Sequence, residues 1–479
     1  MAKILVVLPL SYPLEALEEK VSSLKDTTRL QLAEREPQAI DDKATVQYEN
    51  QEGVLGYNKK TFRTPRGLER AVQFWISIYS KYDNSQYVIH DTDNFVIYEV
   101  VDISDLRRSR LSAYQKDKII QERLEDRKQK YQEILKNIHA KKEDDLNEQE
   151  VRIYNLFENV DEKNKFWKAS SSSRIRSQLG QSDKFEKGIQ YAGQYLPILE
   201  NIFKEENLPL ELTRLPFVES MFNNYARSHA GASGLWQFMP GTGRDFALRV
   251  DSTLDERNDP IKVTVAAAKL LKQNYETLKS WPLAVTAYNH GKMGMYRIAN
   301  KMETNDIVEI INNYSSPTFG FASKNFYAEF LAAVHVEQDY QKYFGQLKTE
   351  KPIEFDAVRL DKYVSLASLV YYTNIDKDTL VELNPAFTSG VLRGTKLIPK
   401  GYYLRIPKNQ KEDFFTTYTR IPKHQKFVQQ VRNRFHRVRH GDTLAYLAKK
   451  YGTSVQAIIQ LNNLDDSRFI RIGENLKIP

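Results

Sequence analysis

The strongest constraint on the fold is the helical spacing of apolar residues between Phe185 and Tyr340. In the first part of this segment apolar residues recur every three or four positions until Asn207 and Pro209, which are typical of a helix end. The apolar stripe consists of Ile189, Ala192, Tyr195, Leu196, Leu199, Ile202 and Phe203. A chain of 479 residues has room for about three domains, so the pattern predicts a mainly α-helical domain within a multidomain protein.

Glu219 is the one acidic residue in the otherwise apolar run 215–222, LPFVESMF. Apolar surroundings disfavour the ionised form of a carboxyl group and raise its pKa toward the range of a general acid. A glutamate at the end of a helix, beside a core face, is more often simply solvated. The residues around Glu219 leave both interpretations open.

The next distinctive segment, 231–242, reads GASGLWQFMPGT and concentrates small residues, one amide and aromatic rings. Glycines here would let the backbone approach a ligand closely. Gln237 offers both a hydrogen-bond donor and an acceptor. Trp236, Phe238 and Tyr288 are candidates for the flat apolar faces against which sugar rings lie.

Three motifs in order carry a family resemblance. Glu219-Ser220, GASGLWQFMPGT and Ala287-Tyr-Asn-His-Gly291 resemble the successive motifs of the lysozyme-like lytic murein transglycosylases of glycoside hydrolase family 23, in particular the membrane-bound D type. The resemblance implies a lysozyme-like (goose-type or soluble lytic transglycosylase) α-helical catalytic domain over residues 175–345.

The resemblance also implies roles for individual residues. Glu219 matches the catalytic acid and base, and Ser228 matches a serine that contacts the glycan and helps to orient that acid. Tyr288 and Asn289 match residues that line the cleft beside the acid, and Tyr327 matches a late tyrosine that faces it. The further substrate-binding residues that the resemblance implies are Gly234, Gln237, Phe238 and Met239.

The number of carboxylates bears on the reaction type. Ordinary glycosidases need two carboxyl groups, and between Glu219 and Asp245 this chain has no Asp or Glu, where goose-type lysozymes place aspartates that position water. The resemblance therefore implies non-hydrolytic cleavage of the β-1,4 bond between N-acetylmuramic acid and N-acetylglucosamine, leaving a 1,6-anhydro end and needing no cofactor or metal. A goose-type lysozyme and a catalytically silent peptidoglycan-binding scaffold are the alternatives.

Two C-terminal segments form an internal repeat. Residues 364–384 align without a gap with 442–462, and both end in asparagine, Asn384 and Asn462. Each copy predicts a strand, two short helices and a strand. The second copy, over 435–479, resembles a LysM module, which implies N-acetylglucosamine-containing glycan as its ligand. The residues implicated are Gly441, Asp442, Thr443 and Asn462.

The first copy, over 352–408, departs from this pattern. It has Tyr363-Val364 where the second copy has Gly441-Asp442. Glycan binding and a purely structural role are therefore both open for this degenerate LysM-like module.

The basic charge is concentrated between the two copies. The chain carries a net charge of +8, and residues 409–440 hold eight Lys or Arg against two Asp or Glu. We expect a basic linker over 409–434, and contact between 409–440 and an anionic wall that weakens with salt. No recognisable nucleic-acid fold accompanies the patch, so nucleic acid is not an expected partner.

The segments before 175 carry no catalytic motif. Lys3 and the apolar run 4–10 make residues 1–20 at most a weak signal segment, and 21–174 is expected to be mostly helical. No other run approaches the ~18 apolar residues of a membrane helix, and the chain has no cysteine for the lipid anchor common in this type. We expect a cell-envelope protein, periplasmic or secreted, with at most peripheral membrane association.

A histidine pair near the C-terminus raises the question of a metal. His436 and His440 are four residues apart in a predicted strand, where their positions would be roughly 13 Å apart. That separation is too large for shared coordination, so a zinc site is not expected.

Overall fold

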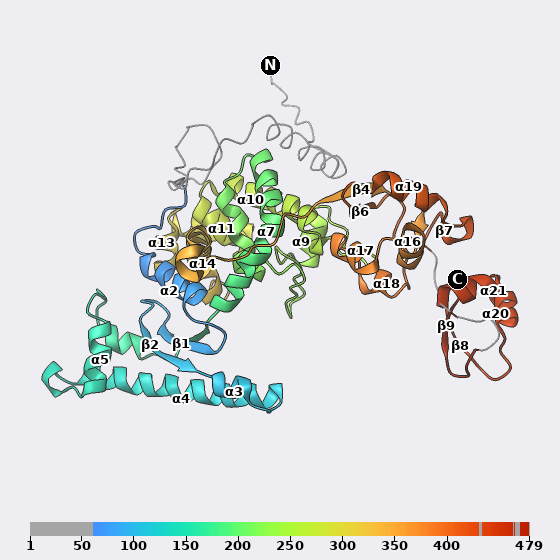
Figure 1. The fold of residues 1–479 in the computed structure, drawn as a ribbon. Coiled ribbons are helices and arrows are strands. Elements are labelled where there is room, and N and C mark those ends of the chain that lie inside the picture. The colour runs from blue at the N-terminus through green and yellow to red at the C-terminus, as the bar shows by residue number, and fades with distance from the viewer. Residues whose placement is uncertain (1–60, 431–433, 463, 465–469, 479) are drawn as a thin grey trace, which may run out of the picture.

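The computed structural model describes residues 61–430, 434–462, 464 and 470–478. Three parts follow one another along an elongated molecule: an N-terminal sheet with its helices, a helical body, and two small C-terminal modules (Figure 1). The expected mainly α-helical, multidomain fold is confirmed. Residues 1–20, and 21–60 of the region expected to be mostly helical, lie outside the described residues.

The helical body is built around one apolar core. Its longest helix carries the stripe read from the sequence, and Ile189, Ala192 and Leu199 are buried there. The body comprises α2 (Glu69–Ser80), α7 (Ser182–Glu205), η2 (Leu210–Arg214), α8 (Leu215–Ser220), α9 (Pro240–Asp245), η3 (Glu256–Asn258), α10 (Pro260–Leu278), α11 (Trp281–His290), α12 (Lys292–Met302), α13 (Ile307–Asn313), α14 (Phe321–Gln338) and α15 (Tyr340–Phe344).

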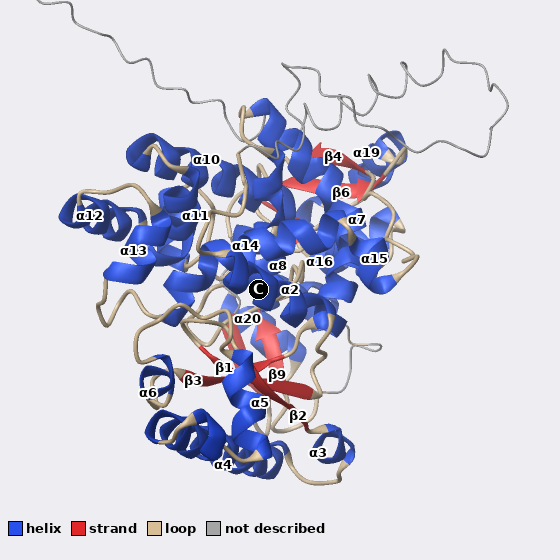
Figure 2. Cartoon of the chain, turned by 90° about the vertical axis from the view of Figure 1, so that its left-hand side faces the viewer, coloured by secondary structure: helices blue, strands red, loops and turns tan. Residues whose placement is uncertain are grey.

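A three-stranded antiparallel sheet of order β2-β1-β3 lies between the body and the long helix α4 (Figure 2). Because strand side chains alternate, Val88 of β1 joins the core of the body while Ile89 joins a second core with α4. The elements of this part are β1 (Gln86–Asp91), β2 (Ile97–Asp102), α3 (Ser104–Arg108), α4 (Ala113–Ala140), η1 (Glu143–Asp145), α5 (Glu148–Leu156), α6 (Lys165–Ala169) and β3 (Ile175–Leu179).

The expected boundary between residues 174 and 175 differs from the structure in two ways. Helix α2 belongs to the helical body, where Trp75 Nε1 donates to Asn325 Oδ1 of α14 at 2.9 Å. Strand β3, expected in the catalytic domain, pairs with β1 through Ile89 and Ser177. The chain therefore enters the body, leaves it to form the sheet, and returns.

Both C-terminal modules contain an antiparallel strand pair and short helices (Figure 1). The second module has the expected order, with β8 (Arg434–Arg437), α20 (Leu444–Tyr451), α21 (Val455–Asn462) and β9 (Asn475–Ile478). The first contains β4 (Phe355–Arg359), β5 (Tyr363–Val364), α16 (Leu366–Thr373), α17 (Lys377–Leu383), α18 (Ser389–Leu392), β6 (Tyr403–Pro407), α19 (Lys411–Thr419), η4 (Lys423–Gln425) and β7 (Lys426–Phe427).

The expectation of a linker over 409–434 is wrong for most of that segment. Helix α19 buries Phe414 and Tyr418 in the core of the first module, and the Tyr418 hydroxyl donates to Asp361 Oδ1 at 2.7 Å. Strand β7 then pairs with β5. Because aromatic rings four residues apart share one helix face, the segment folds onto the module, which runs to about Gln430.

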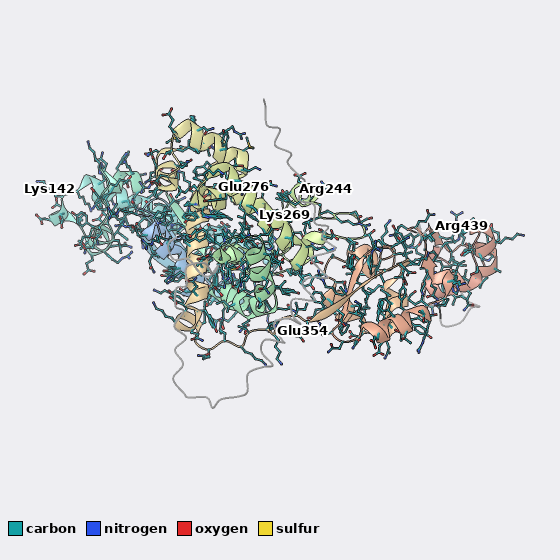
Figure 3. The ribbon with its side chains drawn as sticks, turned by 90° about the horizontal axis from the view of Figure 1, so that it is seen from above. Lys142, Arg244, Lys269, Glu276, Glu354 and Arg439 are labelled. Carbon is teal, nitrogen blue, oxygen red and sulfur yellow. The ribbon has the colours of Figure 1, made fainter. Side chains whose placement is uncertain are left out.

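Within the described ranges, none of the helices is both long and apolar enough to cross a bilayer. Figure 3 shows from above how the parts succeed one another, with Lys142 in the part that contains the three-stranded sheet, Lys269 and Glu276 on the body, and Arg439 in the second module.

Candidate functional site

Glu219 is held near the end of the short helix α8. Pro216 favours the start of this helix, and Met221 and Phe222 end it with φ values of 51° and 56°. The ring of Phe217 stacks on Phe185 of α7 at 4.7 Å. The hydroxyl of Ser220 donates to the carbonyl oxygen of Leu235 at 2.8 Å, so the helix end is tied to the glycine-rich segment.

The surroundings of Glu219 favour its protonated form. Burial of the carboxyl group, and then the charge of Glu329, raise its pKa to about 8. The residue as a whole is half-buried. A carboxyl group that holds its proton at neutral pH can donate that proton to a ligand within reach.

A second carboxyl group, Glu329 of α14, was missed by the sequence interpretation. Burial raises its pKa to about 8 as well, while the charge of Arg176 opposes that change. Helix α14 packs against α8, and the charges of Glu329 and Glu219 both add to the burial that raises the pKa of Tyr79. The available signal was one acidic residue in the run FYAEFLAA, most of which is buried.

The glycine-rich segment is pinned to the body by Arg257. The guanidinium donates to the carbonyl oxygens of Gly231 at 2.8 Å and Phe238 at 2.9 Å. Asp255 holds the guanidinium through two contacts of 2.9 and 2.8 Å. Gly234 has φ +80°, and a Cβ there would lie 1.9 Å from the Arg257 carbonyl oxygen. Gly234 therefore serves the close approach of two backbone segments.

Gln237 lies in the turn that this anchoring creates. Its φ is 47°, and its Nε2 donates to the carbonyl oxygens of Gly234 at 2.8 Å and Ala226 at 3.1 Å. Both donors of the amide are thereby engaged, whereas the Oε1 atom retains acceptor capacity. Met239, which follows, is 42% exposed.

Two of the three aromatic candidates do not face solvent. Trp236 and Phe238 are 0% and 2% exposed, and Trp236 Nε1 donates to Thr264 Oγ1 at 2.8 Å. Phe238 is therefore a core residue and not a sugar platform. Tyr288 is half-buried; its hydroxyl donates to the Trp236 carbonyl oxygen at 2.7 Å, and burial together with the Glu219 charge raises its pKa.

The remaining predicted site residues of the body also differ in exposure to solvent. Asn289 is exposed, and its Oδ1 accepts from Ser323 Oγ at 2.9 Å. Ser228 is exposed too, but its hydroxyl accepts the N–H of Ala232 at 2.9 Å and so closes its own loop. Tyr327 is 1% exposed, with its ring 6.2 Å from Phe330, and its role beside the acid stays a prediction.

In the second module, the predicted glycan-binding residues make internal contacts. Asp442 Oδ2 accepts the N–H of Arg439 at 2.7 Å and lies 2.6 Å from His436 Nε2. Thr443 caps α20 by accepting the N–H of Tyr446. Gly441 takes φ +87° in the intervening turn.

Asn462 connects the two ends of this module. Its amide donates to the Lys477 carbonyl oxygen at 2.8 Å and accepts the Lys477 N–H at 2.7 Å. In the first module, Asn384 makes the same pair of bonds to Arg405, at 2.8 and 2.9 Å. The asparagine shared by the two copies therefore joins the second helix to the closing strand, and a contact of Asn462 with glycan stays a prediction.

The prediction that one strand carries both histidines is wrong, because His436 lies in β8 against Asp442, whereas His440 lies beyond the strand end. Among the described residues no group of three His, Asp or Glu is placed to hold a metal ion.

Comparison with known proteins identifies two domain families. Residues 197–311 match the transglycosylase SLT domain family, and residues 436–479 match the LysM domain family. These matches confirm the two resemblances read from the motifs.

Individual curated proteins are similar to parts of the chain. Membrane-bound lytic murein transglycosylase D of Escherichia coli is 28% identical over 296 residues, which cover 60% of this chain and 64% of that protein. A putative tributyltin chloride resistance protein of an Alteromonas strain is 33% identical over 113 residues, 23% of this chain and 55% of that protein. The chain thus spans a little under two thirds of its longest-matching curated relative.

Two solved structures are similar to part of this chain. Lytic transglycosylase Slt of Pseudomonas aeruginosa is 20% identical, with a TM-score of 0.26 over 33% of this chain and 25% of that one. The 70 kDa soluble lytic transglycosylase of Escherichia coli is 22% identical, with a TM-score of 0.24 over 31% of this chain and 25% of that one.

Proposed function

We propose that this chain, which carries a transglycosylase SLT domain and a LysM domain, is a peptidoglycan lytic transglycosylase. The observation that carries the proposal is Glu219, whose carboxyl group has its pKa raised to about 8 by burial, inside the segment that matches the SLT family. Gln237, Met239, Tyr288 and Asn289 lie within the same matched segment and would bind the glycan beside it.

In the proposed reaction Glu219 acts first as acid and then as base. Its carboxyl group gives a proton to the oxygen between N-acetylmuramic acid and N-acetylglucosamine, the C1–O bond breaks, and the substrate's acetamido oxygen stabilises C1. The resulting carboxylate then takes the proton of the C6 hydroxyl while that oxygen bonds to C1. Glu219 ends protonated, the product carries a 1,6-anhydro ring, and no water is consumed.

A goose-type lysozyme is the second candidate, because Glu329 supplies the further carboxyl group that hydrolysis could use. A base that activates water must be ionised at the working pH. With its pKa raised to about 8 by burial, Glu329 is mostly protonated at neutral pH. This favours the transglycosylase reaction over hydrolysis.

The product distinguishes the two candidates. We expect purified peptidoglycan digested by the chain to yield muramic ends lighter by one water than reducing ends, as measured by mass spectrometry. Products with only reducing ends would establish a hydrolase, and the absence of any glycan cleavage would establish a binding scaffold.

The pH profile tests the coupling between Glu219 and Glu329. Because the acid must be protonated, cleavage should fall about tenfold per pH unit above a midpoint near pH 8. In Glu329→Gln the neighbouring charge is gone, so the pKa of Glu219 should fall and the alkaline midpoint should move to lower pH. The measurement is the initial rate of cleavage of soluble glycan strands between pH 5 and 10.

Glu276→Gln is the matched control for this profile, because Glu276 is an exposed glutamate on α10. It should leave the midpoint unchanged. If Glu329→Gln behaves like this control, the two carboxyl groups are not coupled.

We further propose that the LysM domain binds wall glycan and that the protein acts in the cell envelope, in the periplasm or after secretion. A bound module keeps the catalytic body at high effective concentration near the next bond. Exposed cations of the described part of 409–440, such as Lys423 and Arg439, would add salt-sensitive contact with wall carboxylates.

A further inference from the structure

The first LysM-like module is fastened to the catalytic body by the loop after its second helix. The Asp255 N–H of the body donates to the Ala386 carbonyl oxygen at 2.8 Å, and the Thr388 N–H donates to the Thr253 carbonyl oxygen at 3.2 Å. Leu254 lies in the apolar core of the module. The loop that follows the second helix of the module is therefore occupied by the body itself.

A surface pocket of about 440 Å³ lies at this junction. That volume is within the range of sites for small organic ligands. Both parts contribute to its walls, so the pocket exists only when the module is docked. Its lining residues are Arg227, Asp251, Ser252 and Asp255 of the body, and Thr388, Ser389, Gly390, Arg393, Thr395 and Lys396 of the module.

The two acidic residues of the pocket are neutralised within the body. Asp255 is held by Arg257 through both carboxylate oxygens. Asp251 accepts the N–H groups of Thr253 and Leu254, at 2.6 and 3.0 Å, and Arg249 Nε at 2.6 Å. Their negative charge is therefore largely compensated before a ligand arrives.

The three cations of the pocket have no such compensation. Within the described part of the chain, Arg227, Arg393 and Lys396 form no ion pair. Arg393 NH2 donates to Ser389 Oγ at 3.1 Å, which directs the guanidinium along the pocket wall. Three cations among hydroxyl groups give the pocket a positive lining, which favours an anion.

The pocket adjoins the loop 226–228, which also contacts the glycine-rich segment. Arg227 lies between Ala226, whose carbonyl oxygen accepts from Gln237, and Ser228 of the same loop. Asp255 also adjoins the pocket and holds Arg257, which anchors Gly231 and Phe238. A glycan that contacts Gln237 would therefore pass close to the cations at the junction.

We propose that this junction pocket binds a carboxylate of the peptide stem on the glycan strand that is being cleaved. The proposal rests on the proposed function for its ligand, since stem peptides are the carboxylate-bearing branches of peptidoglycan. It gives the docked first module a role in substrate selection that does not require its own glycan groove.

Direct binding tests the pocket independently of cleavage. The full chain is titrated calorimetrically with soluble stem peptide, and wild type should bind it. Arg393→Gln combined with Lys396→Gln should bind at least about fivefold more weakly, because two charge-assisted contacts are lost. Lys400→Gln, an exposed lysine of the same module outside the pocket lining, should bind as wild type does.

Cleavage supplies the second readout. Wild type should process stem-bearing strands faster than strands stripped of their peptides, and the double variant should lose most of that preference. Wild-type chain that does not bind the peptide, or that binds inorganic phosphate instead, would overturn the proposal even if glycan is cleaved. Peptide binding without any glycan cleavage would overturn the proposed function and retain the pocket.

Discussion

Replacing Glu219 by glutamine should lower glycan cleavage by at least about 10²-fold, the usual loss when a general acid and base is removed. The amide has nearly the same shape but has no acidic proton to give and cannot take one from the C6 hydroxyl. The contacts that hold the helix end, such as the bond from Ser220 to Leu235, do not involve the carboxyl group. The measurement is release of soluble products from purified peptidoglycan at pH 6.

Stability provides the first control for this variant. The pKa of Glu219 is raised from 4.5 to about 8 by burial, so the folded protein loses free energy of stabilisation as pH rises between those values. Glutamine does not ionise, and Glu219→Gln should therefore melt at the same or a higher temperature than wild type at pH 7.5. Glu276→Gln should keep full activity. Near-normal turnover by Glu219→Gln, in protein that remains folded, would remove the basis of the proposed mechanism.

The sequence predicts best what is encoded locally. The long helix α4 lies in the region 21–174 that was expected to be mostly helical, and Leu124, Tyr131 and Leu135 are buried on one side of it. The glycine-rich motif was expected to let the backbone approach a ligand closely, whereas Gly234 allows the close approach of its own backbone to that of Arg257. For α4, the spacing of apolar residues within one segment contains the whole physical reason for the helix.

Features that depend on distant partners were not predictable in this way. Helix α2 belongs to the body because it packs on α14, about 250 residues later in the chain. Glu329 reaches the neighbourhood of Glu219 by the same kind of long-range packing. Periodicity identifies the apolar face of a helix but not the helix that covers it.

Residue type was a poor guide to exposure within the motif. Trp236 and Phe238 suggested sugar platforms because aromatic rings suit that task, yet both are buried. The basic segment after residue 409 suggested a linker because of its charge, yet Phe414 and Tyr418 anchor it to the module. In each case the burial of apolar side chains decides where the residues lie. Aromatic character in the first case, and positive charge in the second, indicated the wrong location.

The largest stability effect should come from Asp259, which joins the body to the first module. Its Oδ1 contacts Arg405 NH2 at 2.8 Å, and both side chains are almost fully buried, at 2% and 3% exposure. The same oxygen caps α10 by accepting the N–H groups of Ile261 and Lys262. Asp259→Ala would leave the buried Arg405 guanidinium without this carboxylate, which should lower the free energy of unfolding by about 3 kcal/mol or more. Loss of the helix cap should lower it by about 1 kcal/mol further.

Denaturant unfolding at pH 7 measures this loss, and two variants separate its causes. Asp306→Ala removes a comparable helix cap on α13, where the Asp306 carboxylate accepts exposed N–H groups. This variant should lower the free energy of unfolding by only about 1 kcal/mol. Asp259→Leu with Arg405→Met removes both charges and should recover much of the loss.

The pH dependence of the Asp259 contribution has a defined sign. Burial would raise the pKa of Asp259, but the charges of Arg405 and Lys262 outweigh it and hold that pKa below 3.8. The stabilisation is therefore complete above pH 3.8 and is lost as pH falls through the lower folded pKa. The difference in unfolding free energy between wild type and Asp259→Ala should stay constant from pH 5 to 8 and shrink in acid. A cost no greater than that of Asp306→Ala would mean that the junction, and the pocket it forms, does not depend on this ion pair.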